Sequence, residues 1–413
     1  MSKTLLGKQL PIAILTLWLL TFTVWTQLTV QASTNSWQVV SFMPGNTKSP
    51  ILALSVSPTK PNIIIAAKAF GPIFFSNTYG RSWIKAKYPL IGAIIYGVYF
   101  SPFSQNTVYI TTNKGLLISD NGGLSYKLVK STEGLTVYSL AISQSYIFLA
   151  TNHGVLKQNT QGSQLLATSL DHIPVTNIAA LVIYGTPVVM AATQRMQPNM
   201  PFKLYITKNG GADWQPIALP SPNASVYCLS AGAPKATKNF RPIVLGTQTG
   251  AYISTDEGST WIKVNGIAQK DISACEYLPG SNNEEVLASD GGGTANGGLW
   301  LATPSTTINI GQRLPPGSVS AIAVSKVNNE NLIYVALWNT STGKSALLSA
   351  PLNGAQPEQP TSFSWHNTSN HATHDTSISN GNLNTLPEIA VGILLFVAFV
   401  LGVASLVRNA AIK

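Results

Sequence analysis

A nine-residue segment that recurs along the chain limits the possible folds more than any other feature of the sequence. Its clearest copy is ISTDEGSTW, residues 253–261, with Ser254, Asp256, Gly258, Thr260 and Trp261 at fixed offsets. The equivalent residues in three other copies are Ser76, Gly80 and Trp83; Ser119, Asn121, Gly123 and Tyr126; and Thr207, Asn209, Gly211 and Trp214. With a degraded copy at 157–165, the segment recurs roughly every 40 to 49 residues, a period typical of repeat folds such as β-propellers.

Between these copies the sequence predicts β-strands in a constant order. Each unit begins with two apolar strands, such as VYSLAIS (137–143) and YIFLATN (146–152). A glycine then opens a third strand, as in GAYIS (250–254), and the recurring segment leads into a fourth, as in TWIKVN (260–265). Runs of β-branched and aromatic residues broken by Gly, Pro and Asn are strand signals. The pattern predicts an all-β fold made of four-stranded antiparallel sheets.

Seven such units fit into the chain. Their first strands are expected near residues 51, 95, 137, 177, 226, 272 and 319, and the last two units lack the recurring segment. SWQVVSF (36–42) resembles the fourth strands and is expected to complete the seventh unit, which would close a ring without an open sheet edge. The alternative is that SFSW (362–365) supplies this strand.

The composition of the recurring segment indicates a structural turn. The side chain at its third position is Asp256 in one copy, Asn121 and Asn209 in two others, and Thr78 in the fourth. Each can accept backbone N–H groups within its own turn, and the glycine permits a positive φ. A catalytic carboxylate would not tolerate this exchange. The terminal aromatic ring is expected to bury apolar area between sheets, which contributes about 1.5–3 kcal/mol each.

These residues resemble the Asp-box, or bacterial neuraminidase repeat, of a β-propeller family that includes sialidases, sortilin-type receptors, xyloglucan-hydrolysing enzymes and photosystem II assembly factors. The resemblance covers residues 36–352, most of the chain. The single seven-bladed propeller of the assembly-factor branch matches the count of units, although the arginine-rich patch of that branch is missing here. The resemblance implies the fold and says little about function, because function belongs to sites placed on a fold.

The two ends of the chain carry apolar segments that indicate export and membrane anchoring. Residues 1–32 have a basic start, an apolar run and small residues before Ser33, so they are expected to form a signal peptide cleaved after Ala32. An uncleaved signal anchor is the alternative. Residues 389–407 contain no charge and would span about 28 Å as a transmembrane helix. The basic residues that follow place the tail, 408–413, in the cytoplasm and the propeller outside.

Residues 354–388, between the propeller (33–353) and the membrane segment, are rich in Ser, Thr, Asn and Pro and are predicted to form a disordered stalk. His366, His371 and His374 fall in this stalk beside Asp375. Imidazole is a common metal ligand, but a solvated linker is the simpler interpretation. No metal and no cofactor are expected.

The balance of charged residues limits the classes of partner that the protein can bind. The chain has 25 basic and 15 acidic side chains, and the excess is spread along the sequence without a basic cluster. No nucleic-acid-binding motif is present, and export also argues against a nucleic-acid partner. The mild positive charge is compatible with anionic cell-wall polymers or lipid headgroups. A monomer is expected.

The chain contains two cysteines, Cys228 and Cys275, which are expected on the inner strands of blades five and six. In aligned register they differ by one position, so they point to opposite faces of their own sheets, and facing sheets can bring them together. A disulfide is compatible with an exported protein. Two buried thiols fit the sequence equally well.

In a propeller of this kind the Asp-box turns line one rim, and the loops between second and third strands and between blades line the other. The second-to-third loops are extended in blades four, six and seven, at residues 193–203, 289–298 and 337–345. Loops on a rigid scaffold commonly carry function. Trp338 could stack on a sugar or a peptide side chain, and Arg195 and Arg313 could bind carboxylate or phosphate. The candidate ligand-binding residues are Arg195, Met196, Phe202, Asp290, Arg313, Trp338 and Lys344.

The expected function is non-catalytic binding of a protein or a cell-surface glycan, or an assembly-factor-like scaffold, and no catalytic residue is predicted. The alternative is an exported glycoside hydrolase. Arg241, in NFRPI (239–243), is similar to a sialidase Phe-Arg-Ile-Pro signature, but in sialidases that signature precedes the first Asp-box and here it lies in the fifth unit. Xyloglucan-type hydrolysis needs a carboxylate pair in a cleft between two propellers, and only one propeller is predicted.

Overall fold

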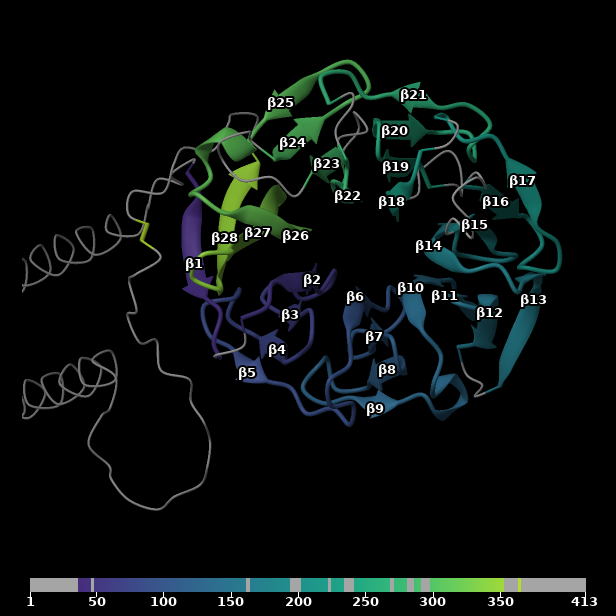
Figure 1. The fold of residues 1–413 in the computed structure, drawn as a ribbon, viewed down its shortest axis with the longest axis horizontal. Helices are drawn as coiled ribbons and strands as arrows, with labels where there is room; N and C mark the ends of the chain where they lie inside the picture. The colour runs from purple at the N-terminus through teal and green to yellow at the C-terminus, as the bar shows by residue number, and fades with distance from the viewer. Residues whose placement is uncertain are drawn as a thin grey trace, which may run out of the picture. The chain divides into compact units, whose positions relative to one another are not determined.

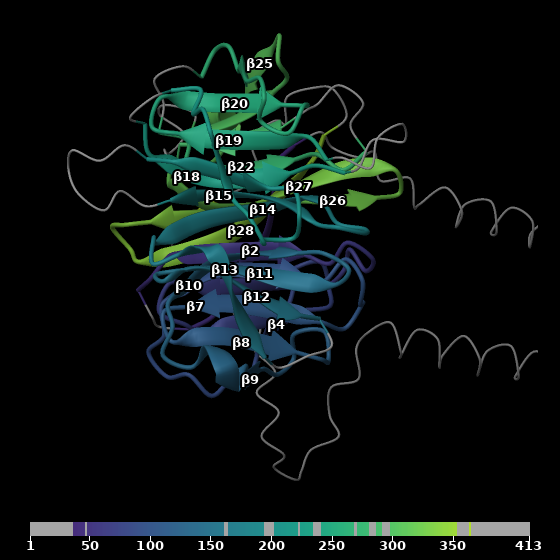
Figure 2. The same cartoon turned by 90° about the vertical axis from the view of Figure 1, so that its right-hand side faces the viewer.

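The computed structural model describes residues 36–45, 48–160, 164–193, 202–221, 224–233, 241–267, 271–280, 286–290, 298–352 and 363–364. Within these residues the chain forms seven four-stranded antiparallel sheets, arranged as blades around a common axis (Figure 1). Figures 1 and 2 both place blade two and blade six on opposite sides of the ring. The predicted seven-bladed β-propeller is confirmed.

In blades one to six the chain runs from the axis outward, each strand pairing with the next. The innermost strands are β2 (Ile51–Val56), β6 (Ile95–Phe100), β10 (Val137–Ile142), β14 (Val175–Val182), β18 (Val226–Ala231), β22 (Ala274–Tyr277) and β26 (Ser318–Val327). The second strands are β3 (Ile64–Lys68), β7 (Val108–Thr112), β11 (Tyr146–Thr151), β15 (Val188–Thr193), β19 (Ile243–Thr247), β23 (Val286–Ser289) and β27 (Glu330–Asn339).

The outer half of each blade contains the third and fourth strands. The third strands are β4 (Ile73–Ser76), β8 (Gly115–Ser119), β12 (Gly154–Asn159), β16 (Leu204–Thr207), β20 (Gly250–Ser254), β24 (Leu299–Ala302) and β28 (Lys344–Leu352). The fourth strands are β5 (Ile84–Lys85), β9 (Lys127–Leu128), β13 (Leu165–Asp171), β17 (Gln215–Ile217), β21 (Ile262–Lys263), β25 (Thr307–Asn309) and β1 (Gln38–Phe42). Two short 3₁₀ turns, η2 (Lys130–Thr132) and η3 (Gly311–Arg313), lie between blades.

The N-terminal strand closes the ring. β1 pairs with β28 to give the order β1-β28-β27-β26 in blade seven. The prediction for residues 36–42 is therefore confirmed. The alternative segment does not replace β1: its Phe363 packs against Phe42, with ring centroids 6.0 Å apart. Because the first and last parts of the propeller share one sheet, unfolding either part opens the ring.

The hydrophobic core lies between neighbouring blades. Every residue of β3, β7, β15, β19 and β23 is buried, and in β11 only Tyr146 is partly exposed, because each second strand is covered by a sheet on both faces. This explains why these strands read as continuous apolar runs in the sequence. The fourth strands are mostly exposed; β5 and β21, for example, contain no buried residue.

The four complete Asp-boxes form the same hydrogen-bond circuit between the third and fourth strands. In the copy of blade five, the Ser254 hydroxyl accepts the Gly258 N–H at 2.8 Å and donates to Asp256 Oδ1 at 2.9 Å. Asp256 Oδ1 also accepts the Thr260 N–H at 2.9 Å. The glycine has a φ of +81°, which only glycine adopts without strain. Ser76, Ser119 and Thr207 accept the equivalent glycine N–H in their turns, each at 2.9 Å.

The aromatic residue that ends an Asp-box ties its blade to the preceding one. Trp83 of blade one is 7% exposed, and its indole N–H donates to Ser41 of β1 at 2.9 Å. Ser41 in turn donates to the Gly80 carbonyl at 2.7 Å. Trp214 of blade four donates to Thr168 of β13 at 3.1 Å. The Asp-box therefore shapes a corner and buttresses the interface between blades, as its composition predicted.

The disulfide that the sequence left open is present, since Cys228 and Cys275 are bonded. Cys228 lies on β18 and Cys275 on β22, the inner strands of neighbouring blades. Cys275 packs with Cys228 between the two sheets, as the one-position difference in register requires.

Several predictions lie outside the described residues: the signal peptide (1–32), the stalk (354–388, apart from 363–364), the transmembrane helix (389–407) and the tail (408–413). Among the residues that the structure describes, no helix has the length and apolarity needed to cross a membrane. The same part of the chain contains no group of three or more His, Cys, Asp or Glu side chains suited to a metal ion.

Candidate functional site

The rim opposite the Asp-boxes carries the turns between second and third strands and the connections between blades. Three of these turns are built alike around a threonine: Thr112, Thr151 and Thr247 donate to the carbonyls of Gly115, Gly154 and Gly250 at 2.7–2.9 Å. Each threonine also accepts the N–H of the residue two positions on. We call the rim formed by the second-to-third turns and the connections between blades the opposite rim.

Six inner strands begin at the opposite rim with the same backbone irregularity. In these blades the register between the first and second strands shifts by one residue immediately after a buried Ile or Val. The extra residue is a β-bulge, which re-aims a side chain out of the ladder. In blade six the paired residues show no such shift, and Ser273, which follows the buried Ile272, is the residue at the corresponding position. The seven residues at these positions, which we call the bulge ring, are Leu52, Tyr96, Tyr138, Thr176, Tyr227, Ser273 and Ser320.

The bulge ring stands out from its buried surroundings. The residue before each ring position is at most 6% exposed: Ile51, Ile95, Val137, Val175, Val226, Ile272 and Val319. In contrast, Leu52 is 43% and Tyr227 41% exposed, and no ring residue is fully buried. Because the ring residues occupy the first positions of the innermost strands, they surround the axis at one end.

Three tyrosines give the bulge ring an aromatic side. Tyr96 and Tyr138, on neighbouring blades, have ring centroids 5.3 Å apart at an angle of 52°. Burial and the neighbouring Tyr138 both raise the pKa of Tyr96. Gly97 follows Tyr96, and a Cβ at this glycine would lie 2.6 Å from the ring of Tyr99. The absence of a side chain at Gly97 thus leaves room for the ring of Tyr99.

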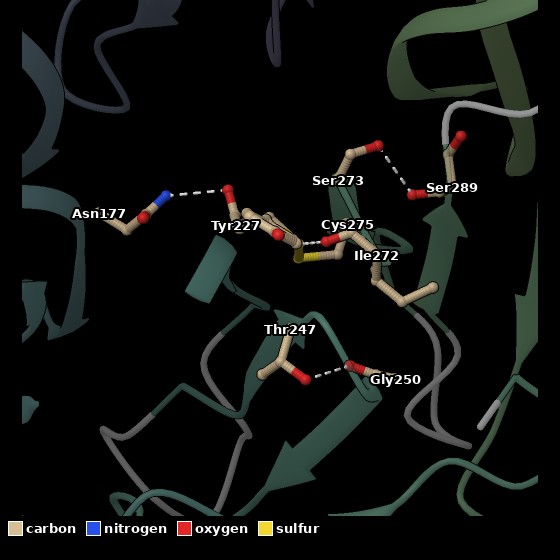
Figure 3. Close-up of a disulfide and its surroundings, with 9 residues drawn as sticks. Asn177, Tyr227, Thr247, Gly250, Ile272, Ser273, Cys275 and Ser289 are labelled. Carbon is tan, nitrogen blue, oxygen red and sulfur yellow. Dashed lines mark hydrogen bonds between the residues drawn. A yellow bond between two sulfur atoms is a disulfide. The ribbon is translucent and has the colours of Figure 1, made fainter. Parts of the chain in front are cut away.

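The residues after the bulges connect the ring between blades three and six. Ser139 donates to the carbonyl of Thr176 at 3.0 Å, and Asn177 donates to the carbonyl of Tyr227 at 3.2 Å (Figure 3). The next link in this series is the Cys228–Cys275 disulfide. The backbone at Thr176 and at Tyr227 is therefore held by the preceding blade, which fixes where these two side chains stand.

Five of the predicted rim residues are described by the structure; they lie on the opposite rim and are distributed over blades four, six and seven. Trp338 and Lys344 flank the turn of blade seven between β27 and β28. Phe202 and Asp290 lie at the second-to-third connections of blades four and six, and Arg313 ends η3. All five are partly exposed. Arg195 and Met196 lie outside the described residues. Trp338 pairs with Ser318 at the start of β26, which places it beside the ring residue Ser320.

Arg241, the residue that resembles a sialidase signature, is a clamp between blades. Its guanidinium donates to the carbonyls of Ala180 at 3.1 Å and Ala231 at 2.9 Å, and also to Gly232. These carbonyls belong to the ends of β14 and β18 on the Asp-box side. Burial lowers the pKa of Arg241 to about 10. A guanidinium whose donors are used on backbone carbonyls is suited to holding two sheets together.

Glu276, in β22, is the one acidic residue of the seven inner strands as the structure describes them. It is partly buried and forms no ion pair with another described residue. Burial raises its pKa to about 8, so the carboxyl is mostly protonated at neutral pH. A single neutral carboxyl is not the pair of acids that most glycosidases require.

The bulge ring was not predicted, although the sequence contains a signal for it. The strand starts IYG (95–97), VYS (137–139) and VYC (226–228) share a β-branched residue, a tyrosine and a small residue. ILA (51–53), VTN (175–177), ISA (272–274) and VSA (319–321) keep the outer two positions and vary the middle one. The extended loops predicted binding residues in the connections of blades four, six and seven, whereas the tyrosines lie in blades two, three and five.

Comparisons with known proteins identify the fold and leave the family open. No family model matches the sequence, and no curated protein matches it. Among solved structures, YCF48 from Cyanidioschyzon merolae superposes with a TM-score of 0.54 at 14% identity, covering 76% of this chain and 98% of that chain.

Two further structures superpose equally well. A structure titled YCF48 bound to D1 peptide gives a TM-score of 0.53 at 14% identity, covering 78% of this chain and 98% of that chain. BBS1N in complex with ARL6DN gives 0.53 at 14% identity, covering 78% and 99%. At this identity the likeness shows the propeller fold alone.

Proposed function

We propose that this chain is a non-catalytic binding module that recognises a protein ligand with the end of the propeller bearing the bulge ring. One observation carries the proposal: seven corresponding positions, six of them at backbone bulges, present their side chains around the axis, and three adjacent or near-adjacent ones are tyrosines. Tyrosine combines a large apolar ring with a hydroxyl and few rotatable bonds, so it contributes strongly to protein recognition.

The chemistry of the ring favours binding over catalysis. Its seven side chains are one leucine, three tyrosines, one threonine and two serines. The ring contains no carboxylate or imidazole that could act as the base needed to activate its serine, threonine or tyrosine hydroxyls as nucleophiles. Arg241 is engaged with backbone carbonyls, so it does not contribute to a carboxylate-binding arginine cluster.

Two structures of the same architecture support a protein ligand. One propeller of this fold, YCF48, is titled as bound to a D1 peptide, and another, BBS1N, as in complex with ARL6DN. Different propellers of this size therefore serve as platforms for protein partners. We extend this use of the fold to the present chain, with the bulge ring as the contact surface.

We place this module at the cell surface, on the basis of the two apolar terminal segments. A signal peptide at 1–32 would export the propeller, and a helix at 389–407 would anchor it with the tail, 408–413, in the cytoplasm. The disulfide between blades five and six agrees with an oxidising compartment. The residues from 354 to 388 would separate the bulge ring from the membrane, leaving it accessible to a large ligand.

The test is selection of linear peptides from a random display library against the full chain in nonionic micelles, with a glycan array as a parallel arm. Peptides enriched on the native chain are expected to lose about tenfold in affinity, or 1.4 kcal/mol, on the double variant Tyr96→Ala/Tyr138→Ala. The matched control is Tyr184→Ala, because Tyr184 is 49% exposed and lies between β14 and β15, toward the Asp-box rim.

Peptides that bind the double variant as tightly as the native chain would remove the bulge ring from the proposal. Binding confined to the glycan array, and sensitive to the same two tyrosines, would replace the protein ligand by a carbohydrate. A Trp338→Ala variant that lowers affinity in either arm would extend the surface to blade seven. One that does not would limit it to the tyrosine side.

A further inference from the structure

We propose a second binding site, independent of the bulge ring, in a pocket of blade one that takes an acidic peptide segment carrying a large apolar side chain. The pocket has a volume of about 540 Å³. It lies between the second-to-third loop of blade one and the connection from β5 to blade two. The residues that line it are Phe70, Gly71, Pro72, Lys85, Ala86, Lys87, Tyr88, Leu90, Ile91 and Gly92.

The walls of the pocket are held by hydrogen bonds to the propeller. Ala86 donates its N–H to the carbonyl of Ile73 at 2.9 Å, and the N–H of Ile95 donates to the carbonyl of Ala69 at 2.9 Å. The ammonium group of Lys114, from blade two, donates to the carbonyl of Ile91 at 2.9 Å. The loop of blade one and the connection to blade two are thereby fixed on both sides of the pocket, so the pocket is formed before any ligand arrives.

Gly71 and Tyr88 shape the floor. Gly71 has a φ of +69°, and a Cβ added to it would lie 2.3 Å from the hydroxyl oxygen of Tyr88. A side chain at position 71 would therefore displace Tyr88. The backbone at Gly71 therefore lies close to the ring of Tyr88, and most other residues at position 71 would be incompatible with this contact.

The pocket exposes apolar side chains that a soluble surface rarely tolerates together. Ile91 is 90% and Phe70 is 63% exposed. Among the described residues these are the two most exposed large apolar side chains, and both line this one pocket. Covering them would remove unfavourable contact with water, in proportion to the area buried. An apolar side chain of a partner is the complementary group.

The charge around the pocket selects an acidic partner. Lys85 and Lys87 line it, and no acidic residue does. Neither lysine forms an ion pair within the described part of the chain, whereas Asp120 and Glu133, nearby in blade two, are already paired with Lys127 and Lys130. Two uncompensated ammonium groups beside exposed apolar side chains favour carboxylates next to an aromatic or branched aliphatic residue.

A peptide fits these features better than a lipid surface. A membrane would meet Ile91 and Phe70 as protruding groups, but it would leave a hollow of this volume unfilled. An apolar side chain inserted between the two loops fills the hollow and brings the carboxylates of neighbouring Asp and Glu side chains in the peptide toward Lys85 and Lys87. We therefore commit to an acidic peptide segment and treat an anionic lipid as an outcome of the test.

The experiment measures fluorescence anisotropy of labelled peptides titrated with the full chain in nonionic micelles. The probe is DDFEELD, with NNFQQLN and DDSEESD as counterparts that lack the charges or the apolar side chains. DDFEELD is expected to bind at least about fivefold more tightly than either counterpart, and its affinity should fall as salt is raised. The double variant Lys85→Glu/Lys87→Glu should weaken binding about tenfold or more, and Ile91→Ser several-fold.

Matched controls come from blade five, where β21 occupies the same place as β5. Lys263 and Ile262 are both exposed there, and neither Lys263→Glu nor Ile262→Ser should change the affinity. The proposal fails if DDFEELD binds no better than its counterparts, or if the blade-one and blade-five variants act alike. Displacement of the peptide by dihexanoyl phosphatidylserine at a lower concentration than by unlabelled DDFEELD would instead assign the pocket to a lipid headgroup.

This test is separate from that of the proposed function, because Tyr96→Ala/Tyr138→Ala leaves every lining residue of the pocket in place. Loss of binding in one site with retention in the other identifies which proposal fails.

Discussion

The Asp-box rim and the bulge ring repeat around the same axis, but they repeat different properties. In the four complete Asp-boxes a hydroxyl, a positive-φ glycine and an aromatic residue recur, together with the same hydrogen bonds. In the bulge ring only the backbone irregularity and the residues on either side recur. The side chain at the bulge itself changes from Leu52 to Tyr96, Thr176 and Ser320 around the ring.

This difference indicates where a repeat protein can carry specificity. Where side chain and geometry are both repeated, as in the Asp-box, the residues stabilise the repeat itself. Where geometry is repeated and the side chain is free, the scaffold presents a set of independent positions that can be varied without loss of the fold. Changes on the Asp-box rim should therefore alter stability, and changes in the bulge ring should alter binding.

The largest expected effect is on the Asp-box rim at the closure of the ring. Trp83→Ala should lower the free energy of unfolding by roughly 3–5 kcal/mol, as for a buried tryptophan. Trp83 is buried, and its indole N–H bonds to Ser41 of the closing strand. Urea denaturation followed by far-UV circular dichroism measures the change. Ile84→Ala is the control, because Ile84 follows Trp83 in sequence and its side chain is 51% exposed. Equal losses of stability in the two variants would mean that the Asp-box aromatic residue does not support closure of the ring.

The second effect concerns the framework beneath the bulge ring. Replacing both cysteines in Cys228→Ala/Cys275→Ala removes a cross-link between residues 47 apart in sequence, which should cost roughly 2–4 kcal/mol of stability. Ligand affinity should change much less once the protein is folded, because Tyr227 remains held by Asn177. Thermal unfolding gives the stability, and peptide titration below the melting range gives the affinity. A large affinity loss without a stability loss would show that the disulfide acts on the ring directly.

The third effect distinguishes two carboxyl groups, one on the Asp-box rim and one on an inner strand. Burial would raise the pKa of Asp256, but hydrogen bonds from Thr260 and Ser254 outweigh it, and the net result is a lowered pKa. For Glu276, on an inner strand, burial raises the pKa from 4.5 to about 8. Its folded pKa thus lies above its unfolded value, so the stability that protonated Glu276 permits is complete below pH 4.5 and is lost as pH rises through about 8.

A shift of this size corresponds to at most about 5 kcal/mol. Because Glu276 is partly exposed, solvent screening should reduce the stability lost between acidic and mildly alkaline pH to roughly 2–3 kcal/mol, and Glu276→Gln should abolish most of this slope. Urea denaturation at a series of pH values measures it. Asp290→Asn is a suitable control, because it removes a carboxylate from the same blade at the opposite rim. A slope that persists in Glu276→Gln would mean that another group titrates.

Much of the fold can be predicted from the sequence because it depends on short-range sequence patterns. The period of the Asp-boxes, the apolar second strands and the orphan strand at 36–42 all follow from local composition, and together they predict seven blades and their closure. The geometry that permits the disulfide also follows, since Cys228 and Cys275 differ by one position in an aligned register. Whether the thiols are joined does not follow from register alone.

The candidate sites are much harder to predict from the sequence, for two physical reasons. A β-bulge depends on how a strand pairs with its neighbour, so Tyr138 and Tyr227 read as ordinary strand residues until the register is known. The pocket of blade one depends on the approach of two segments about 15 residues apart, around Gly71 and Tyr88. Loop length, the signal available in the sequence, does not show where side chains gather.

The smallest expected effect tests the claim that the Asp-box rim is purely structural. Asp256→Asn should change stability by less than about 0.5 kcal/mol, because an amide oxygen can accept the Thr260 N–H as Asn121 accepts the Ser125 N–H at 3.0 Å. The amide nitrogen can donate to Thr260, as that of Asn121 donates to Ser125 at 2.8 Å. Asp256→Ala removes these acceptors and should cost about 1 kcal/mol, measured by the same urea denaturation. If Asp256→Asn proves as harmful as Asp256→Ala, the negative charge itself matters, and the division between a structural rim and a binding ring would have to be redrawn at blade five.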